Sequence, residues 1–269
     1  MKKEPKTIDI SGQFILLGTG TSVGVPTVGC WCDVCASTNP RNKRTRASAI
    51  VGLPEGNLLI DTAPDLRTQL IREGIGVVHS VVFTHEHADH IFGLDDLRIF
   101  QFYLGHAVPL YCEAAVEDRL RESYSYVFAD VQHTHRGAVP ALQFHRIGEE
   151  PFHVLGAQVT PIRLRHGPRF DVLGFRVGDV AYCTDTNEVP PASLDLLQGL
   201  DCLIIDALRP SPHQTHFSLE EAVAVASLVN AKQTYFTHCS CELDYEKTNA
   251  KLPAGMELAY DGLKIPFTK

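Results

Sequence analysis

Residues 81–94 constrain the fold of this chain more than any other stretch. Residues 81–83 are apolar and favour β structure, so they predict the end of a buried strand. Potential metal ligands then crowd into residues 85–90, namely His85, His87, Asp89 and His90. Imidazole and carboxylate are borderline-to-hard ligands that suit zinc, manganese, iron or cobalt. The pattern therefore predicts a metal site at a strand's carboxyl end, rather than a histidine-rich surface loop.

Length and composition predict one sizeable globular core. The chain has 269 residues, of which 44% are hydrophobic and 21% charged, so we expect a single domain over residues 1–269. Its net charge of −8 disfavours a broad surface for nucleic acid. We expect a cytoplasmic protein without a membrane partner, because neither a signal-peptide core nor an apolar run of roughly 18 residues occurs. Eight cysteines then favour reduced thiols and metal ligation over disulfides.

A cysteine-rich run lies near the start of the chain, between a glycine-containing loop and a basic segment. Cys30, Cys32 and Cys35 have C-x-C-x-x-C spacing, which can hold one tetrahedral zinc if a fourth ligand comes from elsewhere. The alternative is three free core thiols. The loop at residues 18–26 predicts a structural turn, with a phosphate cradle as the alternative. The basic run at residues 41–46 predicts a solvated face, with a rim that attracts a phosphorylated substrate as the alternative.

Polar residues recur at the ends of predicted strands. They are Asp61, His85, His166, Asp185, Asp206 and His238. Because ligands bind α/β sheets beyond the carboxyl ends of strands, this recurrence predicts one shared cleft. The expected strands are residues 14–18, 47–51, 58–60, 81–83, 109–112, 157–164, 173–177, 180–183, 203–206 and 234–237, and the expected helices are residues 65–73, 94–98, 113–128 and 219–228. Three further histidines lack such positions and are expected on the surface or in loops: His133, His135 and His145.

The His-x-His-x-Asp-His stretch resembles the signature of the metallo-β-lactamase superfamily. This resemblance implies an α/β fold, a four-layer αββα sandwich with two metals at one edge of the sheets. It also implies that Asp61 orients the histidine loop, whereas a plain strand-end turn residue is the alternative.

More stretches narrow the resemblance: residues 18–26, the cysteine run, residues 84–90, His216 before a helix, residues 237–238 and the tail at residues 252–263. Together they resemble the phosphoribosyl cyclic phosphodiesterase family of the carbon–phosphorus lyase pathway, from about residue 14 to the end. In that family a structural zinc is held by three cysteines and a histidine. Here Cys241 occupies the histidine position, and a thiolate serves zinc equally well.

The resemblance implies a complete set of site residues. The first of two catalytic ions, manganese or zinc, would be held by His85, His87 and His166. The second would be held by Asp89, His90 and His238, with Asp185 bridging both. One structural zinc would be held by Cys30, Cys32, Cys35 and Cys241. The cysteines expected in the core are Cys112, Cys183 and Cys202, while Cys239 is left outside the zinc site.

The implied activity is hydrolysis of a small phosphodiester, a cyclic ribose phosphate, by a hydroxide that both metals share. His216, Asp89 and Asp185 are the expected catalytic residues, with His216 protonating the leaving group or stabilising the phosphate. The resemblance also implies a homodimer. Alternatives are a hydrolase like the transfer-RNA 3′-processing endonucleases, a metalloprotein of pyrroloquinoline quinone biosynthesis, and a binding module with a degenerate site. The roles of His213 and Asp206 are left open.

Overall fold

Two mixed seven-stranded β-sheets pack face to face in this computed structural model, which describes residues 4–130 and 135–268. In sheet order, the first consists of β14 (Leu263–Pro266), β1 (Gln13–Gly18), β2 (Ser48–Leu53), β3 (Gly56–Ile60), β4 (Ser80–Val82), β5 (Val108–Cys112) and β6 (Leu142–Arg146). The second consists of β13 (Met256–Leu258), β12 (Gln233–Thr237), β11 (Cys202–Asp206), β10 (Val180–Cys183), β9 (Phe170–Val177), β8 (Ala157–His166) and β7 (Phe152–Val154).

The strands are apolar on both faces, and this decides the number of layers. In β1, Phe14 and Leu16 enter the core between the two sheets, while Ile15 and Leu17 enter the core under the first helical layer. Residues of β11 alternate in the same way between the inter-sheet core and the core beneath α8. Because both faces of each sheet must be covered, the chain forms four layers.

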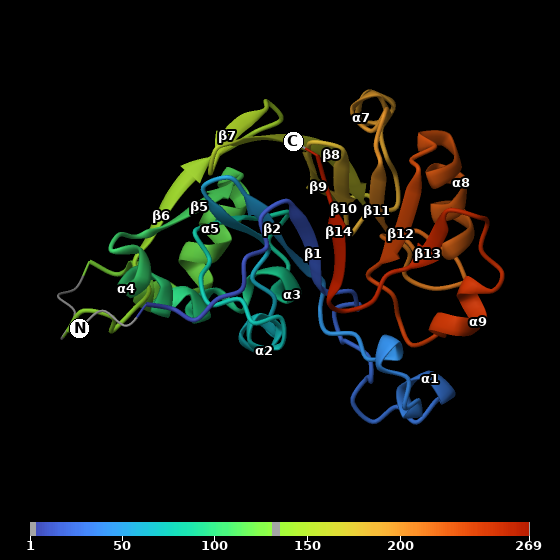
Figure 1. The fold of residues 1–269 in the computed structure, drawn as a ribbon, viewed down its shortest axis with the longest axis horizontal. Coiled ribbons are helices and arrows are strands. Elements are labelled where there is room, and N and C mark those ends of the chain that lie inside the picture. Colours follow the sequence, from blue (N-terminus) through green and yellow to red (C-terminus); the bar gives the residue numbers. More distant parts are fainter. Residues whose placement is uncertain (1–3, 131–134, 269) are drawn as a thin grey trace.

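Helices supply the outer layers. In Figure 1 α2, α3, α4 and α5 lie outside the first sheet, and α8 and α9 lie outside the second. The helical segments are α1 (Asp33–Ala36), α2 (Leu66–Arg72), α3 (Ala88–Ile91), α4 (Phe100–Leu104), α5 (Ala114–Ser123), α6 (Ser125–Phe128), α7 (Pro191–Leu196), α8 (Leu219–Val229) and α9 (Tyr245–Asn249), with the 3₁₀ helices η1 (Pro40–Asn42) and η2 (Leu94–Ile99). The predicted αββα sandwich is therefore confirmed. Among the described residues, every helix is too short or too polar to cross a membrane.

A lobe formed by residues 19–46 leaves the first sheet between β1 and β2 and projects from the body of the molecule (Figure 1). The predicted solvated face at residues 41–46 is wrong for Arg44, which is 1% exposed. Its guanidinium donates to the carbonyl oxygens of Ser240 at 2.9 Å and Leu243 at 2.7 Å. Lys43 donates to the carbonyl of Cys35 at 2.9 Å. The basic run therefore holds the lobe together and ties it to the segment after β12.

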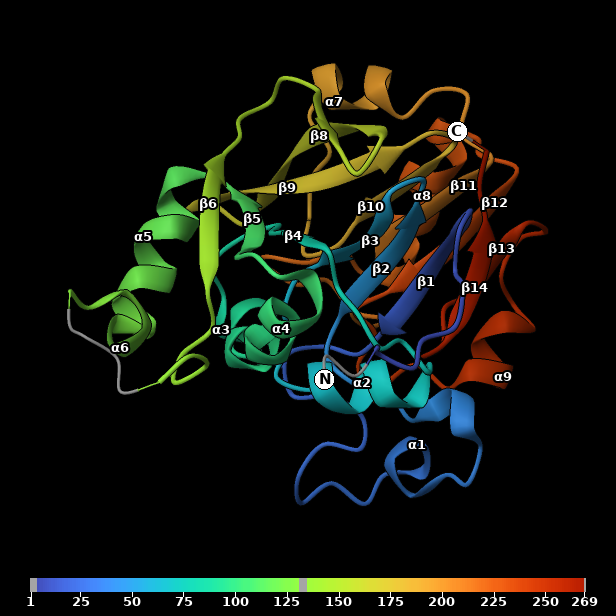
Figure 2. The ribbon, with the colours of Figure 1, turned by 60° about the vertical axis from the view of Figure 1, so that its left-hand side comes forward.

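The tail of the chain joins the two sheets. Figure 2 shows β13 in the second sheet and β14 beside β1 in the first. Between these strands, Asp261 accepts hydrogen bonds from the backbone and hydroxyl groups of Thr19 and Thr45. The sequence pattern misses both strands, because each has three or four residues and gains its pairing only from distant strands.

Other differences from the predicted elements are local. The helix expected at residues 113–128 is divided at Tyr124 into α5 and α6, and residues 94–98 form a 3₁₀ helix. The half-exposed strands β6 and β7 were not predicted, because their apolar alternation is weak. His145 lies in β6 and stacks on Tyr111, His135 is exposed, and His133 lies outside the described residues.

Candidate metal centre

The polar strand-end residues meet at one edge of the sandwich. Asp61 and His238 follow β3 and β12 directly, and Asp185 lies two residues after β10. All three have a left-handed backbone, with φ of 64° for Asp61, 56° for Asp185 and 59° for His238. His166 and Asp206 are the last residues of β8 and β11. The structure thus brings together the positions that the strand-end pattern singles out, although their role as metal ligands stays a prediction.

His85, His87 and His166 form one group, in which the potential ligand atoms lie within 4.8 Å of one another. Nδ1 of His85 is 2.9 Å from the hydroxyl of Thr84, and Nδ1 of His166 donates to the carbonyl of Thr215 at 2.8 Å. These bonds fix the ring orientations and leave Nε2 of both residues for the shared space. Nε2 of His166 lies 3.3 Å from Nδ1 of His87.

Asp89, His90, Asp185 and His238 form a second group, again with ligand atoms within 4.8 Å. Nε2 of His90 lies 3.2 Å from Oδ2 of Asp185 and 3.4 Å from Oδ2 of Asp89. Nε2 of His238 lies 3.3 Å from Oδ1 of Asp185. Asp185 also approaches His166, a member of the first group, so its carboxylate stands between the two groups.

Asp61 lies behind the second group and is fully buried. Its carboxylate accepts hydrogen bonds of 2.8 Å from the backbone and the hydroxyl of Thr84. It also accepts from Nδ1 of His90 at 2.8 Å, which turns Nε2 of that ring toward Asp185. This contact is the one that the family resemblance implies for Asp61.

Several nitrogen atoms in these groups are buried without a hydrogen-bond partner among the described residues. They are Nε2 of His85, Nε2 of His90, and both ring nitrogens of His238. Such atoms are rare in native proteins, because each costs about 1–3 kcal/mol when left unsatisfied. Divalent cations would coordinate their lone pairs, and a mixed imidazole and carboxylate set suits zinc or manganese. The residues present therefore fit divalent metal ions.

The electrostatics of the two groups also suit the binding of a cation. Burial lowers the pKa of His85 well below its usual range. At His90 burial acts in the same direction, but the surrounding carboxylates, first of all Asp185, outweigh it and raise the pKa well above its usual range. The carboxyl of Asp89 shows the opposite shift. Burial raises the pKa of Asp89, but the neighbouring His90 outweighs this effect and holds that pKa well below its usual range. Carboxylates that stay ionised around a buried centre are what a cation site requires.

His216 lies beside both groups. Its ring stacks on that of His238 with centroids 4.7 Å apart, and the ring centroid of His166 is 4.8 Å away. Nδ1 bonds to Oδ2 of the fully buried Asp206 at 2.8 Å. Burial lowers the pKa of His216, but the charge of Asp206 outweighs this effect and raises that pKa to about 9. Asp206, whose role the sequence analysis left open, therefore orients His216. In the sequence, Asp206 is distinguished only by its position at the end of a strand.

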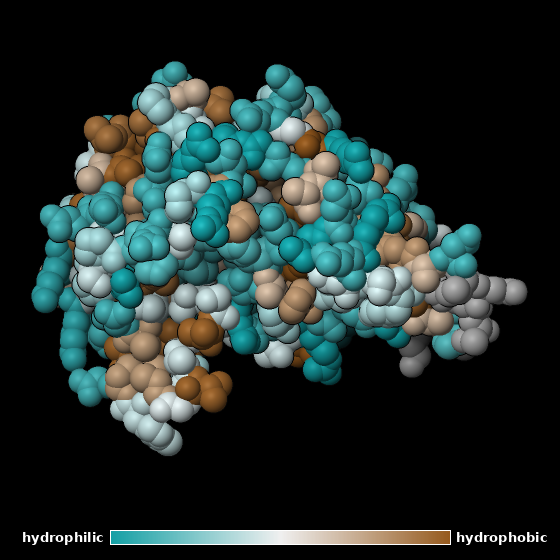
Figure 3. Space-filling model, turned by 180° about the vertical axis from the view of Figure 1, so that it is seen from behind, coloured by the Kyte–Doolittle hydropathy of each residue, from teal (hydrophilic) through white to brown (hydrophobic). Residues whose placement is uncertain are grey.

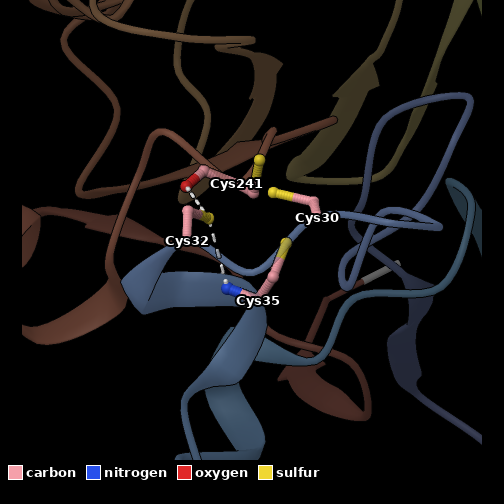
Figure 4. A group of neighbouring side chains, drawn as sticks. All are labelled: Cys30, Cys32, Cys35 and Cys241. Carbon is pink, nitrogen blue, oxygen red and sulfur yellow. Dashed lines mark hydrogen bonds between the residues drawn. The ribbon is translucent and has the colours of Figure 1, made fainter.

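The four cysteines expected to hold zinc also converge. The sulfur atoms of Cys30, Cys32, Cys35 and Cys241 lie within 4.8 Å of one another, and Figure 4 shows their side chains gathered around one space. All eight cysteines of the chain are free thiols. The expected core thiols are all buried, namely Cys112, Cys183 and Cys202, as is Cys239. Four thiolates at this spacing fit one tetrahedral zinc.

Comparisons with known proteins agree with this geometry. The β-lactamase superfamily domain matches residues 56–239. A protein of Porphyromonas gingivalis named octanoyltransferase is 35% identical over 256 residues, which are 94% of this chain and 51% of that protein. The chain thus spans about half the length of this curated relative. The crystal structure of a diphosphatase from the PhnP family is 43% identical, with a TM-score of 0.88 over 95% of this chain and 98% of that chain.

More distant structures share the fold alone. Zn²⁺-bound PqqB from Methylobacterium extorquens is 21% identical, with a TM-score of 0.75 over 94% of this chain and 99% of that chain. The short form of human tRNase Z is 20% identical, with a TM-score of 0.69 over 96% and 100% of the two chains. The chain belongs to the β-lactamase superfamily, and within its metallo-β-lactamase fold it resembles the PhnP family.

Proposed function

We propose that this chain is a metal-dependent hydrolase of a small phosphodiester, with a cyclic ribose phosphate as its substrate. The observation that carries the proposal is the proximity of two groups of potential ligands, one of three histidines and one of histidines and carboxylates. Asp185 belongs to the second group and also lies close to His166 of the first. Such a centre can hold a pair of divalent ions side by side, which suits the displacement of one oxygen at phosphorus by another. The similarity to a PhnP-family diphosphatase supports phosphorus as the reacting atom.

In this proposal His85, His87 and His166 hold one ion. Another set, Asp89, His90 and His238, holds the second, with Asp185 between them. When bound, manganese or zinc ions would supply Lewis-acid stabilisation of the phosphoryl oxygens and would lower the pKa of a water nucleophile. Asp61 keeps His90 in the orientation that this requires, through its 2.8 Å bond to Nδ1.

His216 acts on the substrate in this proposal. Its Nδ1 is held by Asp206 at 2.8 Å, so Nε2 is the nitrogen that is free to face the reacting group. From there it can give a proton to the leaving alkoxide, or donate a hydrogen bond to a phosphoryl oxygen. Asp206 is a positioning residue, because it fixes the tautomer and the ring orientation of His216.

A second candidate activity is hydrolysis of a diphosphate, which the similarity to the diphosphatase favours. Both reactions displace an oxygen at phosphorus and need the same residues. They differ only in whether the leaving group is an alkoxide or a phosphate, and a phosphate leaves with little help from an acid.

Cleavage of precursor transfer RNA and a role in pyrroloquinoline quinone biosynthesis are the less favoured alternatives. The PqqB structure is 21% identical to this chain and the human tRNase Z 20%, against 43% for the PhnP-family diphosphatase. The net charge of −8 also gives little attraction for a polynucleotide. We also propose that the cysteine cluster holds one structural zinc, that residues 1–269 form a single domain, and that the chain forms a homodimer.

The test is a hydrolysis screen of the protein loaded with manganese or with zinc. Substrates are a ribose cyclic phosphate, bis(p-nitrophenyl) phosphate, ADP-ribose as a diphosphate, and precursor transfer RNA. We expect turnover of the cyclic phosphate, and Asp185→Asn should abolish it. Preferred turnover of ADP-ribose would favour the diphosphatase, and cleavage of the RNA alone would favour the nuclease. Failure to cleave any of them, in protein shown by elemental analysis to hold both ions, would contradict the proposal.

A further inference from the structure

Phe170, the first residue of β9, lies directly beside the first histidine group. It pairs with His166 across the hairpin of β8 and β9, and opposite residues of antiparallel strands carry their side chains on the same face. Its ring centroid is 6.4 Å from that of His166 and 5.2 Å from that of His87. Among the described residues, Phe170 is the only aromatic residue other than histidine whose ring packs against a candidate metal ligand.

The side chain of Phe170 is also open to solvent. The residue is 42% exposed, whereas its cross-strand neighbour His166 is buried. A single exposed apolar side chain needs no explanation by itself. Phe170 differs from other exposed residues because its ring contacts two candidate ligands, so it borders the metal centre on a side that solvent reaches.

Polar contacts hold the end of this hairpin in place. The backbone N–H of Gly167 donates to Oδ1 of Asn187 at 2.6 Å, and the backbone N–H of Asn187 donates to the carbonyl of Arg165 at 3.0 Å. Arg165 also forms an ion pair with Asp171, the residue after Phe170. The aromatic ring is therefore held beside the histidines before any ligand binds, which lowers the entropy cost of binding.

An exposed aromatic face at this place suits a flat aromatic ring better than it suits a phosphate. Nucleobases stack on aromatic side chains, and the contact tolerates any base because every base has a π face. Phe170 packs on the ring of His87, whose Nδ1 faces Nε2 of His166 at 3.3 Å within the first group. A base that a ribose joins to a phosphoryl group at this centre can therefore reach the ring of Phe170.

The competing role of Phe170 is to support His87. The rings of His85 and His166 are each oriented by a hydrogen bond at Nδ1, to the hydroxyl of Thr84 and to the carbonyl of Thr215. The ring of His87 meets that of Phe170 edge to face, at an interplanar angle of 74°. Leucine would fill much of the same space without a π face, so Phe170→Leu separates support from stacking.

We propose that Phe170 determines specificity by stacking on a nucleobase, and that the preferred substrate is a small phosphodiester of a nucleoside. A sugar phosphate without a base makes no such contact and binds more weakly. This inference rests on the proposed function, because it assumes that the metal centre takes a phosphoryl group.

Ligand binding tests the stacking without catalysis. The dissociation constants of AMP and ribose 5-phosphate, which differ only in the base, are measured by calorimetry on the manganese-loaded protein. We expect the wild type to bind AMP about 5–100-fold more tightly, as one stacked base provides. Phe170→Leu should reduce this ratio to about 3-fold or less, because it removes the π face. Phe170→Trp should keep at least the wild-type ratio, because indole offers a larger face.

Tyr126→Leu is the matched control. Tyr126 is 48% exposed on α6, and its ring packs on Tyr124 instead of on a histidine. This variant should keep the wild-type ratio, and elemental analysis should find the wild-type number of ions in every variant.

Equal affinities of the wild type for AMP and ribose 5-phosphate, or an unchanged ratio in folded Phe170→Leu, would overturn the stacking role. Loss of an ion from Phe170→Leu would also overturn it and would assign Phe170 to the support of His87. Tighter binding of 5′-phosphorylated triadenylate than of AMP would replace the small nucleotide by an RNA end. Hydrolysis of ribose cyclic phosphate by the wild type tests the proposed function separately, since that compound carries no base.

Discussion

At the scale of single residues, the edge of the sandwich contains several residues with positive φ and several buried side-chain nitrogen atoms without a hydrogen-bond partner among the described residues. Asp61, Asp185 and His238 adopt positive φ, a conformation that costs residues other than glycine some free energy. Asp61 and His238 do so immediately after a strand and Asp185 does so two residues after β10, where the chain must turn while the side chain stays at the sheet edge. In these conformations Asp61 contacts Nδ1 of His90 and Asp185 contacts Nε2 of the same ring. The strained backbone of the two aspartates therefore places carboxylates on both sides of that imidazole.

Asp61 is therefore predicted to control metal affinity without touching metal. Asp61→Ala removes the acceptor for Nδ1 of His90, and the ring loses its fixed orientation. Loss of such an outer contact typically weakens metal binding about 10–100-fold. Titration against a chelator measures the change, with the exposed Asp118→Ala on α5 as the control. Wild-type affinity in folded Asp61→Ala would show that the contact is only structural.

His216 is predicted to affect catalysis and not metal content. His216→Ala should keep both catalytic ions by elemental analysis and should lower kcat by about 10²–10⁴-fold. The loss should be smaller for a p-nitrophenyl ester, because p-nitrophenolate needs little protonation. Equal losses for good and poor leaving groups would indicate phosphate binding instead. Since its ligand atom lies within 4.8 Å of those of His166 and Asp185, loss of an ion in the variant would assign His216 to the metal.

At the scale of elements, the lobe at residues 19–46 depends on contacts that are distant in sequence. Its own apolar cluster contains only a few residues around Val25, Val34 and Cys35. Cys241 comes from the segment after β12, and Arg44 reaches carbonyl oxygens in the same segment. A structural zinc would add strong bonds between these two parts of the chain, where the apolar core is too small to hold the lobe alone.

Cys241→Ser is predicted to release one zinc per chain and to lower the thermal midpoint of the protein. The physical reason is that binding free energy of a structural zinc is folding free energy for the segments that it joins. Elemental analysis and calorimetry measure the two effects. Cys202→Ala, which changes a buried thiol in β11, is the control and should keep the zinc. Retention of zinc and of the full midpoint in Cys241→Ser would refute the assignment.

At the scale of the whole molecule, the projecting lobe exposes apolar side chains. Val28 is 99% exposed and Trp31 is 88% exposed, and Figure 3 shows hydrophobic residues gathered on this projection. Residues 19–32 contain no Asp, Glu, Lys or Arg. Two copies that each carry a charge of −8 repel one another least through such an uncharged face. The lobe is therefore the surface on which the proposed homodimer would form.

Trp31→Ser is predicted to shift a dimer toward the monomer, because aromatic residues contribute strongly to interfaces. Sedimentation over a range of protein concentrations measures the shift. Leu228→Ser removes an exposed apolar side chain on α8, outside the lobe, and should leave the assembly unchanged. A wild-type protein that stays monomeric at high concentration would contradict the homodimer. An unchanged dimer in Trp31→Ser would show that the interface lies on another surface of the molecule.

Local patterns in the sequence determined much of this protein. Short runs of apolar, β-favouring residues marked the central strands, and polar residues at their ends marked the edge where the candidate metal centre lies. Tertiary structure alone decided the rest. The strands β6, β7, β13 and β14 are short or half-exposed, so distant pairing defines them. Arg44 belongs to a basic run that is typical of a surface, yet it is buried because carbonyl oxygens far along the chain satisfy it. The pairing of Asp206 with His216 likewise arises only when the end of β11 and the loop before α8 meet in space.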